Sequence, residues 1–352
     1  MLRDPLVGEL GKIGLREGDT LVIHGSLSAF GRIEGGAERI LDALFAAIGP
    51  EGTIVGPAFR DDIWSESYGI EELRNAAPQD FCSSNLPGFQ GAIPETLRAR
   101  AGALRSFHPT HSWVAVGAKA RQVLKDHGQS PTPCGKGCPA EEAARLDGAI
   151  VGLGVGPETF TMMHYPEDVL AVPYLGAYDR EMRHITYTPG AKRMMYTFPR
   201  LFEEVLLAAS VLAVHRVGKA VVRVSRMRRL LSFLAQAYEA APWWAAVRPE
   251  GFSPDFLQWS LAQSKRVLAA WERRDRPAHL WKGLLSKERS QHDPVPFSGQ
   301  GLKRRCPAWR GEQDELGFCA ANGRHPGFRD RGGLFAEYGV ANCSVCPWEG
   351  PL

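Results

Sequence analysis

Short apolar runs alternate with helical patterns along the first 156 residues of the chain. Four apolar runs have the length and content of buried strands: residues 20–24, 52–59, 112–117 and 147–156. Residues 35–49, between the first two runs, have the apolar spacing of an amphipathic helix. Strands that alternate with helices predict an α/β protein, with a layered α/β/α architecture and a mostly central, mixed sheet.

Beyond residue 195 the pattern becomes mainly helical. We expect amphipathic helices in three segments: residues 198–214, 218–241 and 253–274. From about Arg274 the apolar periodicity fades, and the sequence becomes rich in glycine, proline and charge. We therefore expect one domain at 1–275 with a helical C-terminal part, followed by a Cys-, Gly- and Pro-rich, poorly ordered extension at 276–352.

Composition and charge exclude several classes of protein. Of the 352 residues, 44% are hydrophobic and 23% are charged, as in ordinary globular proteins, and the net charge is only +3. Such a small charge gives no reason to expect nucleic acid or a membrane surface as a partner. No apolar run is long enough to span a bilayer, and the first fifteen residues lack the apolar region of a signal peptide. The seven cysteines are an odd number and are not spaced like a secreted disulfide scaffold, so we expect a cytoplasmic protein.

A polar turn follows the first predicted strand, with the sequence HGSLSAFGRIEGG at 24–36. Loops at strand ends are where α/β folds place ligands. Ser26 and Ser28 provide hydroxyl groups and the nearby glycines expose N–H groups, which would suit a phosphate or a pantetheine amide. The glycine spacing fits neither a Walker loop nor a dinucleotide fingerprint. The alternative is an ordinary strand-to-helix turn.

A second group of polar residues precedes the strand at 112–117. Its members lie close together in the sequence: Arg105, Ser106, His108, Thr110, His111 and Ser112. Such a density of polar groups is not buried without partners. It indicates either a binding segment or a hydrogen-bonded, capped turn.

The third candidate is the stretch PETFTMMHYPEDV at 157–169, which follows the last predicted strand. Thr161, His164 and Glu167 are three residues apart, and residues three apart share a face on a helical turn. Glu167 can therefore orient His164, as a general base requires. The alternative is a structural His–Glu salt bridge on a surface turn. The stretch lacks the second histidine of a metalloprotease helix, and the chain has no G-x-S-x-G elbow.

Several motifs occur in an order that resembles one enzyme family. They read HGSLSAFGRIEGG, EGTIVGPAF, IPETLRARAGALRSFHPTHS, CGKGCP and TMMHYPE, and the resemblance that they carry extends over residues 5 to about 270. This series resembles the aminoglycoside N3-acetyltransferase family of acetyl-CoA-dependent resistance enzymes. Gly25 and Cys138 depart from the family pattern, because each replaces a serine.

The resemblance implies acetyl transfer from acetyl-CoA to an amine, without a metal and without a covalent enzyme intermediate. It gives His164 the role of general base, has Glu167 orient it, and places Thr161 near the thioester. It also implies that two stretches line the path of the pantetheine and the phosphates. Their residues are Ser26, Leu27, Ser28, Ser106, His108 and Thr110.

An acidic loop is the expected contact surface for the substrate. Aminoglycosides are polycations, so their binding site should present carboxylates and aromatic side chains. Four residues of the segment after the second strand supply them: Asp61, Asp62, Asp80 and Trp64. We expect the acceptor to be the 3-amino group of 2-deoxystreptamine. The alternative for the loop itself is an ordinary, solvated acidic loop without a binding role.

Three other hypotheses stay open at this point. The chain is a noncatalytic CoA-binding relative, or it acetylates a different amine metabolite, since family membership does not settle the substrate. The extension contains four cysteines that match a structural zinc site only loosely: Cys306, Cys319, Cys343 and Cys346. The sequence is compatible with a homodimer and names no macromolecular partner.

Overall fold

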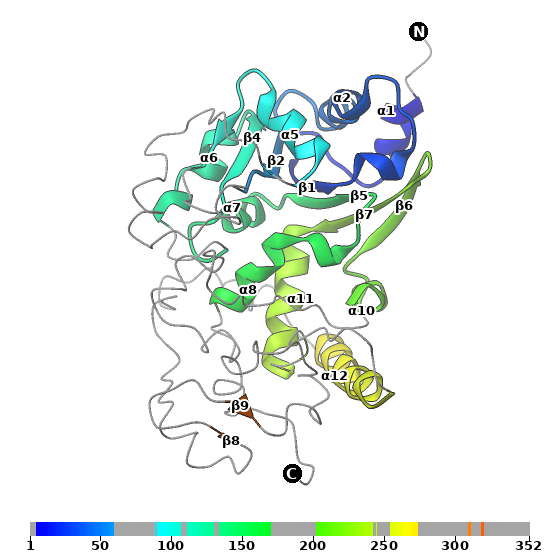
Figure 1. Cartoon of the computed structure of the whole chain (residues 1–352), viewed down its shortest axis with the longest axis vertical. Helices are drawn as coiled ribbons and strands as arrows, with labels where there is room; N and C mark the ends of the chain where they lie inside the picture. Colours follow the sequence, from blue (N-terminus) through cyan, green and yellow to red (C-terminus); the bar gives the residue numbers. More distant parts are fainter. Residues whose placement is uncertain are drawn as a thin grey trace. The chain divides into compact units, whose positions relative to one another are not determined.

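Figure 1 shows the computed structural model of the chain. The structure describes residues 5–59, 88, 90–106, 111–129, 134–169, 202–241, 244, 254–273, 309–310 and 318–319. The chain divides into two compact units. The first comprises Met1–Tyr165, Thr188–Gly190 and Ser210–Leu231, and the second comprises Pro166–Tyr187, Ala191–Ala209 and Ser232–Leu352.

A mixed sheet forms the centre of the first unit. In the described residues it has seven strands in the order β3-β4-β2-β1-β5-β7-β6. Their bounds are β1 Thr20–Gly25, β2 Thr53–Pro57, β3 Leu104–Arg105, β4 Trp113–Gly117, β5 Ala149–Leu153, β6 Ala213–Val217 and β7 Ala220–Arg226. The central strand β1 runs parallel to β2 and β5, and the other pairings are antiparallel. The predicted α/β class with a mixed sheet is confirmed.

Helices cover both faces of this sheet. In Figure 1, α1 (Pro5–Leu10), α2 (Gly36–Ile48) and α5 (Ala92–Ala99) lie on one face, and α7 (Pro139–Arg145) lies on the other. The buried core between α2 and the sheet includes Ile40, Leu44, Leu21 and Ile23. The amphipathic pattern predicted for 35–49 therefore faces the strands, because its apolar stripe is what the sheet buries. The helix α6 (Ala120–Leu124) follows β4 and packs against it.

The prediction of continuous helices at 198–214 and 218–241 is wrong in part. The structure has a helix, α10, only at Phe202–Ala208, then the antiparallel strands β6 and β7, and then α11 at Met227–Ala240. The sequence AVVRVSR of β7 alternates between buried and half-buried positions over most of its length, with Val222 and Val224 facing the core. Alternating β-branched residues are a strand signal, and pairing with β5 outweighs the local helical spacing.

The second unit is mainly helical where it is described. The helix α12 spans Pro254–Glu272, as predicted for 253–274. Trp271 is buried, and its Nε1 donates to the carbonyl of Ala209 at 3.1 Å. Trp244 is also buried, and its Nε1 donates to Ser264 Oγ at 3.2 Å. These tryptophans anchor the helical C-terminal part that the sequence predicted.

Most of the predicted extension lies outside the described residues, so its boundary at 275 stays a prediction. The structure describes only two short strands there, β8 (Trp309–Arg310) and β9 (Phe318–Cys319), which pair antiparallel. Cys306, Cys343 and Cys346 lie outside the described residues. No helix in the described part is long and apolar enough to cross a membrane.

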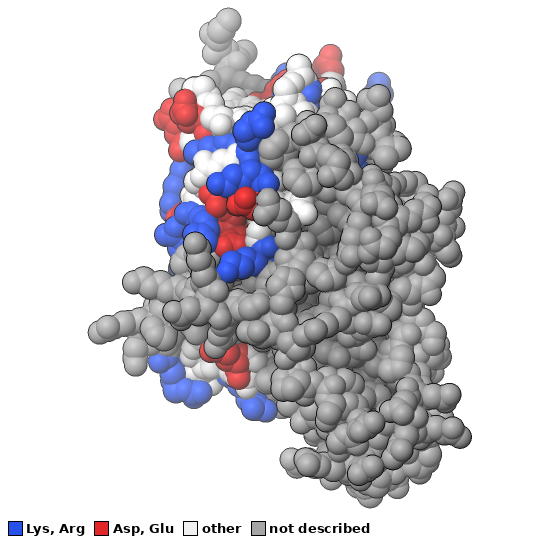
Figure 2. Space-filling model, turned by 90° about the vertical axis from the view of Figure 1, so that its left-hand side faces the viewer, with Lys and Arg blue, Asp and Glu red and all other residues white. Residues whose placement is uncertain are grey.

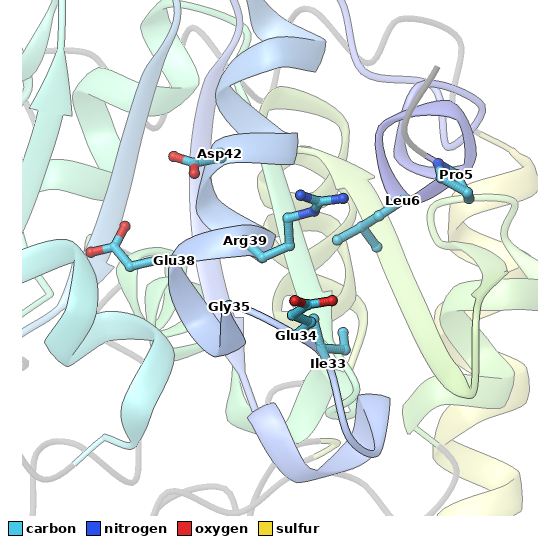
Figure 3. A pocket seen from close by; sticks show the side chains of 8 residues that line it. All are labelled: Pro5, Leu6, Ile33, Glu34, Gly35, Glu38, Arg39 and Asp42. Carbon is cyan, nitrogen blue, oxygen red and sulfur yellow. The ribbon is translucent and has the colours of Figure 1, made fainter. Parts of the chain in front are cut away.

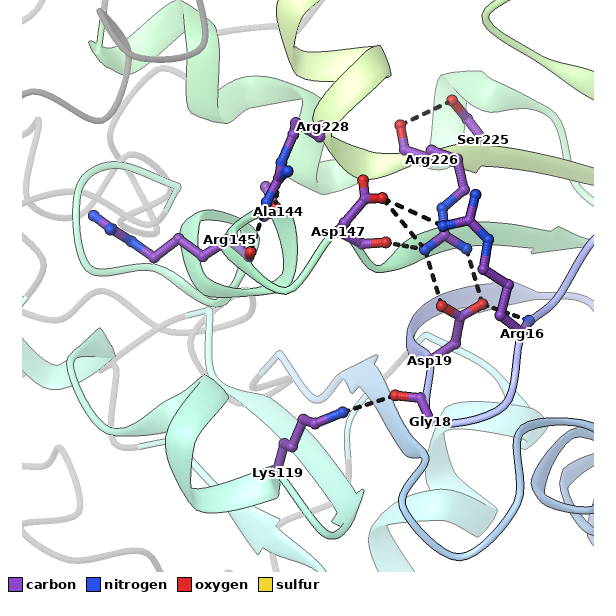
Figure 4. Close-up of polar contacts among 10 residues, drawn as sticks. All are labelled: Arg16, Gly18, Asp19, Lys119, Ala144, Arg145, Asp147, Ser225, Arg226 and Arg228. Atoms are coloured by element: carbon purple, nitrogen blue, oxygen red, sulfur yellow. Dashed lines mark hydrogen bonds and ion pairs between the residues drawn. The ribbon is translucent and has the colours of Figure 1, made fainter. Parts of the chain in front are cut away.

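An ion-pair cluster lies at the end of the sheet where β1 and β5 begin (Figure 4). Asp19, which precedes β1, accepts two hydrogen bonds from the guanidinium of Arg226, at 2.8 and 2.9 Å. The Asp19 carboxylate also accepts from the backbone N–H of Arg16 at 2.8 Å. Asp147, which precedes β5, accepts a bond from Arg226 through its carbonyl. The cluster therefore ties the starts of β1 and β5 to the end of β7.

Charges of both signs are interspersed on the surface. On the described part of the face in Figure 2, Lys and Arg side chains lie next to Asp and Glu side chains. The mixture agrees with the small net charge of the chain.

Candidate active site

The ends of β1 and β5 bring two of the predicted motifs together. His24 of β1 is in register with Gly152 of β5, and the backbone N–H of Ser26 donates to the carbonyl of Leu153 at 2.9 Å. The polar turn after β1 and the turn after β5 therefore start side by side. Gly154 has φ of +74°, and a Cβ there would lie 2.2 Å from Cβ of Ala29. Only glycine permits the two turns to approach this closely.

The polar turn after β1 forms a short 3-10 helix, η1 (Leu27–Phe30). Ser26 and Ser28 are joined by a hydrogen bond between their Oγ atoms at 2.9 Å, and Ser28 is exposed. Leu27 is half-buried and packs against the hydrophobic core. The two hydroxyls thus form one polar spot on the surface, with the leucine holding the turn in place.

The turn after β5 carries the predicted catalytic residues. It contains η3 (Pro157–Thr159) and η4 (Thr161–Met163), and α8 starts at His164 and extends to Val169. Thr161 is half-buried and His164 is 6% exposed. Glu167 lies within α8, one turn beyond His164, as the spacing predicted. Its side chain lies outside the described residues, so its contact with His164 stays a prediction.

Phe160 fixes the start of this turn on the sheet. A Cβ at Gly152 would lie 2.9 and 3.1 Å from two atoms of the Phe160 ring. The missing side chain at 152 therefore makes room for Phe160 directly on the strand, and the backbone of Met163 donates to the Phe160 carbonyl at 2.9 Å. Thr161, the next residue, is positioned by this packing.

His24 is a buried residue of the site that sequence reasoning did not select. Its ring lies 5.8 Å from the ring of Trp113 and 5.9 Å from that of Phe160, measured between centroids. Burial lowers the pKa of His24 to about 3, so the ring is neutral at physiological pH. Its Nε2 has no hydrogen-bond partner within the described structure. The only sequence signal is a histidine at the end of an apolar strand.

Two further buried histidines, His111 and His127, lie close to each other, and His111 also lies near His164. His127 accepts or donates a 2.8 Å hydrogen bond between its Nδ1 and Ser106 Oγ, and the same Oγ accepts from the backbone of Trp113 at 2.8 Å. Burial lowers the pKa of His111 well below its usual value, and the nearby His127 and His164 lower it further. His127 is 0% exposed and His111 is 2% exposed, and the sequence did not predict that His111 lies near His127 and His164.

The polar group before β4 is largely a hydrogen-bonded turn in the described residues. Arg105 is 2% exposed and donates through Nε to Ser112 Oγ at 2.8 Å. Ser112 Oγ donates in turn to the carbonyl of Ala58 at 2.7 Å, and the Arg105 guanidinium donates to the same carbonyl. The capped-turn alternative therefore applies to Arg105, Ser106 and Ser112. His108 and Thr110 lie outside the described residues.

Two buried thiols lie next to the Thr161 turn. Cys138 precedes α7, and its Sγ donates to the carbonyl of Cys134 at 3.1 Å. Cys134 Sγ lies 3.6 Å from the carbonyl of Thr161. Neither cysteine forms a disulfide within the described residues, and both side chains are less than 5% exposed, which fits a packing role for Cys138. The described residues contain no cluster of three metal-ligating side chains.

The site described so far contains neither the residues predicted to bind the substrate nor the groove in Figure 3. Asp61, Asp62, Trp64 and Asp80 lie outside the described residues. The groove in Figure 3 has a volume of about 560 Å³ and contains none of the predicted site residues. Its lining comes from α1, α2 and the turn before α2: Pro5, Leu6, Ile33, Glu34, Gly35, Glu38, Arg39 and Asp42.

Comparison with known proteins shows which proteins this chain resembles. A family model described as aminoglycoside 3-N-acetyltransferase matches residues 22–239. Aminoglycoside N(3)-acetyltransferase III of Acinetobacter baumannii is 36% identical over 181 residues, which make up 49% of this chain and 62% of that protein. Aminoglycoside N(3)-acetyltransferase VIII of Streptomyces fradiae is 31% identical over 172 residues, or 47% of this chain and 60% of that protein. The matched part thus spans about three fifths of these relatives.

Solved structures give the same result for the fold. The crystal structure of aminoglycoside acetyltransferase AAC(3)-Xa is 26% identical, with a TM-score of 0.53 over 68% of this chain and 93% of that chain. The structure of sisomicin-bound AAC-VIa is also 26% identical, with a TM-score of 0.53 over 67% of this chain and 96% of that chain. Since the family model covers more than half of the 352 residues, the chain belongs to the aminoglycoside 3-N-acetyltransferase family, as its motifs predicted.

Proposed function

We propose that this chain transfers the acetyl group of acetyl-CoA to an amine of an aminoglycoside, with His164 as general base. The observation that carries the proposal is the position of the Thr161–His164 turn. It follows β5 beside the Ser26–Ser28 turn that follows β1, so the imidazole that we propose as the base and the two hydroxyls that we propose to contact the cofactor come after neighbouring strand ends. Family membership supports the reaction type.

The reaction needs one proton acceptor and one hydrogen-bond donor. The amine nitrogen attacks the thioester carbon while the imidazole of His164 takes the amine proton. The hydroxyl of Thr161 donates to the carbonyl oxygen as negative charge develops there. The C–S bond then breaks, and the leaving thiolate recovers a proton from the imidazolium. Glu167, one turn along α8, orients the ring of His164 and stabilises its charged form.

The cofactor is held by the turn after β1 and by the segment before β4. Ser26, Leu27 and Ser28 provide direct contacts, because the hydroxyl pair lies at the surface. Ser106 supports the site without contacting the cofactor, because its hydroxyl already forms hydrogen bonds with His127 and with the backbone of Trp113. His108 and Thr110 complete the path. A protein of the same fold, AAC-IIIb, is known as a binary complex with CoASH.

The acceptor is the 3-amino group of a 2-deoxystreptamine aminoglycoside. The names of the relatives and the sisomicin complex of AAC-VIa support this substrate class. Asp61, Asp62 and Asp80 supply carboxylates for the polycation, and Trp64 packs against a sugar face. Acetylation of a different amine is the alternative, and a substrate panel separates the two.

The test is a thiol-release assay with acetyl-CoA, aminoglycosides and unrelated amines. Replacement of His164 by alanine should lower kcat by roughly two to four orders of magnitude, the range for loss of a general base. The matched control is His215→Ala, which removes a histidine from the outermost strand β6 and should leave kcat within a few-fold of the parent.

Circular dichroism of both variants checks that the fold is kept. If His164→Ala keeps kcat near that of the parent at saturating substrate, His164 is structural and the mechanism is wrong. If the parent releases no thiol with any amine but binds CoA, the chain is a noncatalytic relative.

A further inference from the structure

A lysine from a distant part of the chain lies at the end of the sheet where β1 and β5 finish, which is the end that carries the proposed cofactor site. Lys219 lies in the turn between β6 and β7. Because β7 runs antiparallel to β5, with Val222 in register with Leu153, the start of β7 lies where β5 ends. The turn that carries Lys219 is therefore at the same end of the strands as the Ser26–Ser28 turn.

The side chain of Lys219 lies against Gly31, the residue that ends the short helix η1 after that turn. A Cβ built on Gly31 would be 3.2 Å from Cδ and 3.7 Å from Nζ of Lys219. Gly31 ends η1, and its N–H donates to the carbonyl of Ser28 at 3.0 Å. The absence of a side chain at 31 leaves room for the lysine, so its ammonium lies beside the turn that contains Ser26 and Ser28.

The charges around this spot favour an anion. Within the described residues Lys219 makes no ion pair, and the hydroxyls of Ser26 and Ser28 bond only to each other. Arg223 of β7 donates to the carbonyl of Val155 at 3.2 Å, which places a second cation at the neighbouring turn. One carboxylate is close, because Glu9 accepts from the N–H of Gly218 at 2.7 Å.

We propose that Lys219, together with Ser26 and Ser28, binds a phosphate group of acetyl-CoA. The proposal rests on the proposed function, which supplies the phosphate-bearing cofactor. An ammonium attracts a phosphate as a point charge, and two hydroxyls that bond only to each other can turn and donate to its oxygens. Lys219 thus extends the cofactor site from the turn after β1 to the turn between β6 and β7.

The test replaces Lys219 by glutamine, which keeps length and polarity and removes the charge. The matched control is Lys125→Gln, an exposed lysine at the end of α6, which packs against β4 near the opposite edge of the sheet. Acetyl-CoA, acetyl-dephospho-CoA and S-acetylpantetheine serve as donors. The dissociation constant of CoA is measured by calorimetry as a second readout that needs no turnover.

For Lys219→Gln we expect KM for acetyl-CoA and the dissociation constant of CoA to rise roughly 3- to 20-fold, as for one exposed charge-assisted contact. The effect on kcat and on KM for S-acetylpantetheine, which has no phosphate, should be within about two-fold. The increase should shrink at high salt. Loss with acetyl-CoA alone identifies the 3′-phosphate, and equal loss with acetyl-dephospho-CoA identifies the pyrophosphate.

Two results separate this inference from the proposed function. If CoA binds to Lys219→Gln as tightly as to the parent and to Lys125→Gln, the inference is wrong, whatever amine is acetylated. If the parent acetylates no amine but Lys219→Gln still weakens CoA binding, the inference stands and the proposed reaction fails. A parent that does not bind CoA overturns both.

Discussion

Replacing Asp19 by asparagine should remove the main electrostatic support at the amino ends of β1 and β5. The Asp19 side chain is 6% exposed and that of Arg226 is 19% exposed, and two hydrogen bonds at 2.8 and 2.9 Å join them. Asparagine turns an amide N–H₂ group toward one of the guanidinium nitrogens, so two donors then face each other.

The size of the effect follows from burial. Removing one partner of a buried ion pair costs about 3 to 5 kcal/mol, because the other charge stays buried. Arg226 keeps its bond to the carbonyl of Asp147 and lies 3.9 Å from the Asp147 carboxylate, which favours the lower end, about 3 kcal/mol. For a unit of this size that corresponds to a decrease in Tm of about 6 to 12 °C.

The assay must report on the first unit alone, because a chain with two units need not unfold in one step. Hydrogen exchange of peptides from β1, β5 and β7 in increasing urea gives the local free energy of unfolding. Arg16→Gln is the matched control. It breaks the 3.5 Å pair with Asp147, whose side chains are 63% and 36% exposed, and should cost at most about 0.5 kcal/mol. The reasoning is refuted if Asp19→Asn costs no more than Arg16→Gln.

Two other substitutions probe the floor of the site. Gly152→Ala places a Cβ 2.8 Å from the carbonyl oxygen of Val155 and within 3.1 Å of the Phe160 ring, so it should displace the turn that carries Thr161. We expect kcat to fall at least about ten-fold while circular dichroism stays unchanged, and an unchanged kcat would show that these contacts do not position the turn. Burial takes the pKa of His24 from 6.5 to about 3, so below pH 6.5 the unfolded chain binds a proton that the folded chain does not. The free energy of unfolding therefore decreases as the pH is lowered below 6.5. Between pH 7 and pH 5 this loss is about 2 kcal/mol, and His24→Phe should remove it from urea midpoints; an equal loss in both proteins would contradict the assignment.

The sheet could largely be predicted from the sequence, because its strands are nearly continuous apolar runs. Leu21, Ile23 and Val151 are buried between two layers, and such strands show in the pattern of a single segment. The strands β6 and β7 were missed for a related reason. Their valines also fit a helical period, and only the pairing of β7 with β5 decides between the two.

The candidate site was predictable only where its residues are close in the sequence. Thr161 and His164 lie within one turn, so spacing alone placed them together. His24 meets Phe160 and Trp113 through the fold, and more than 80 residues separate it from either. Lys219 reaches Gly31 in the same way. Contacts between distant segments depend on strand order, which local patterns do not contain.

The position of β1 in the sheet has a consequence for synthesis on the ribosome. One edge of β1 pairs with β2, which follows it closely, but the other pairs with β5, whose first residue, Ala149, comes more than 120 residues after Gly25. At about 5 to 20 residues per second, roughly 6 to 25 s pass between the two. During that interval a nascent chain exposes an unpaired apolar strand, which another chain or a chaperone can bind. Slower elongation between these strands should therefore increase aggregation more than slower elongation after β7.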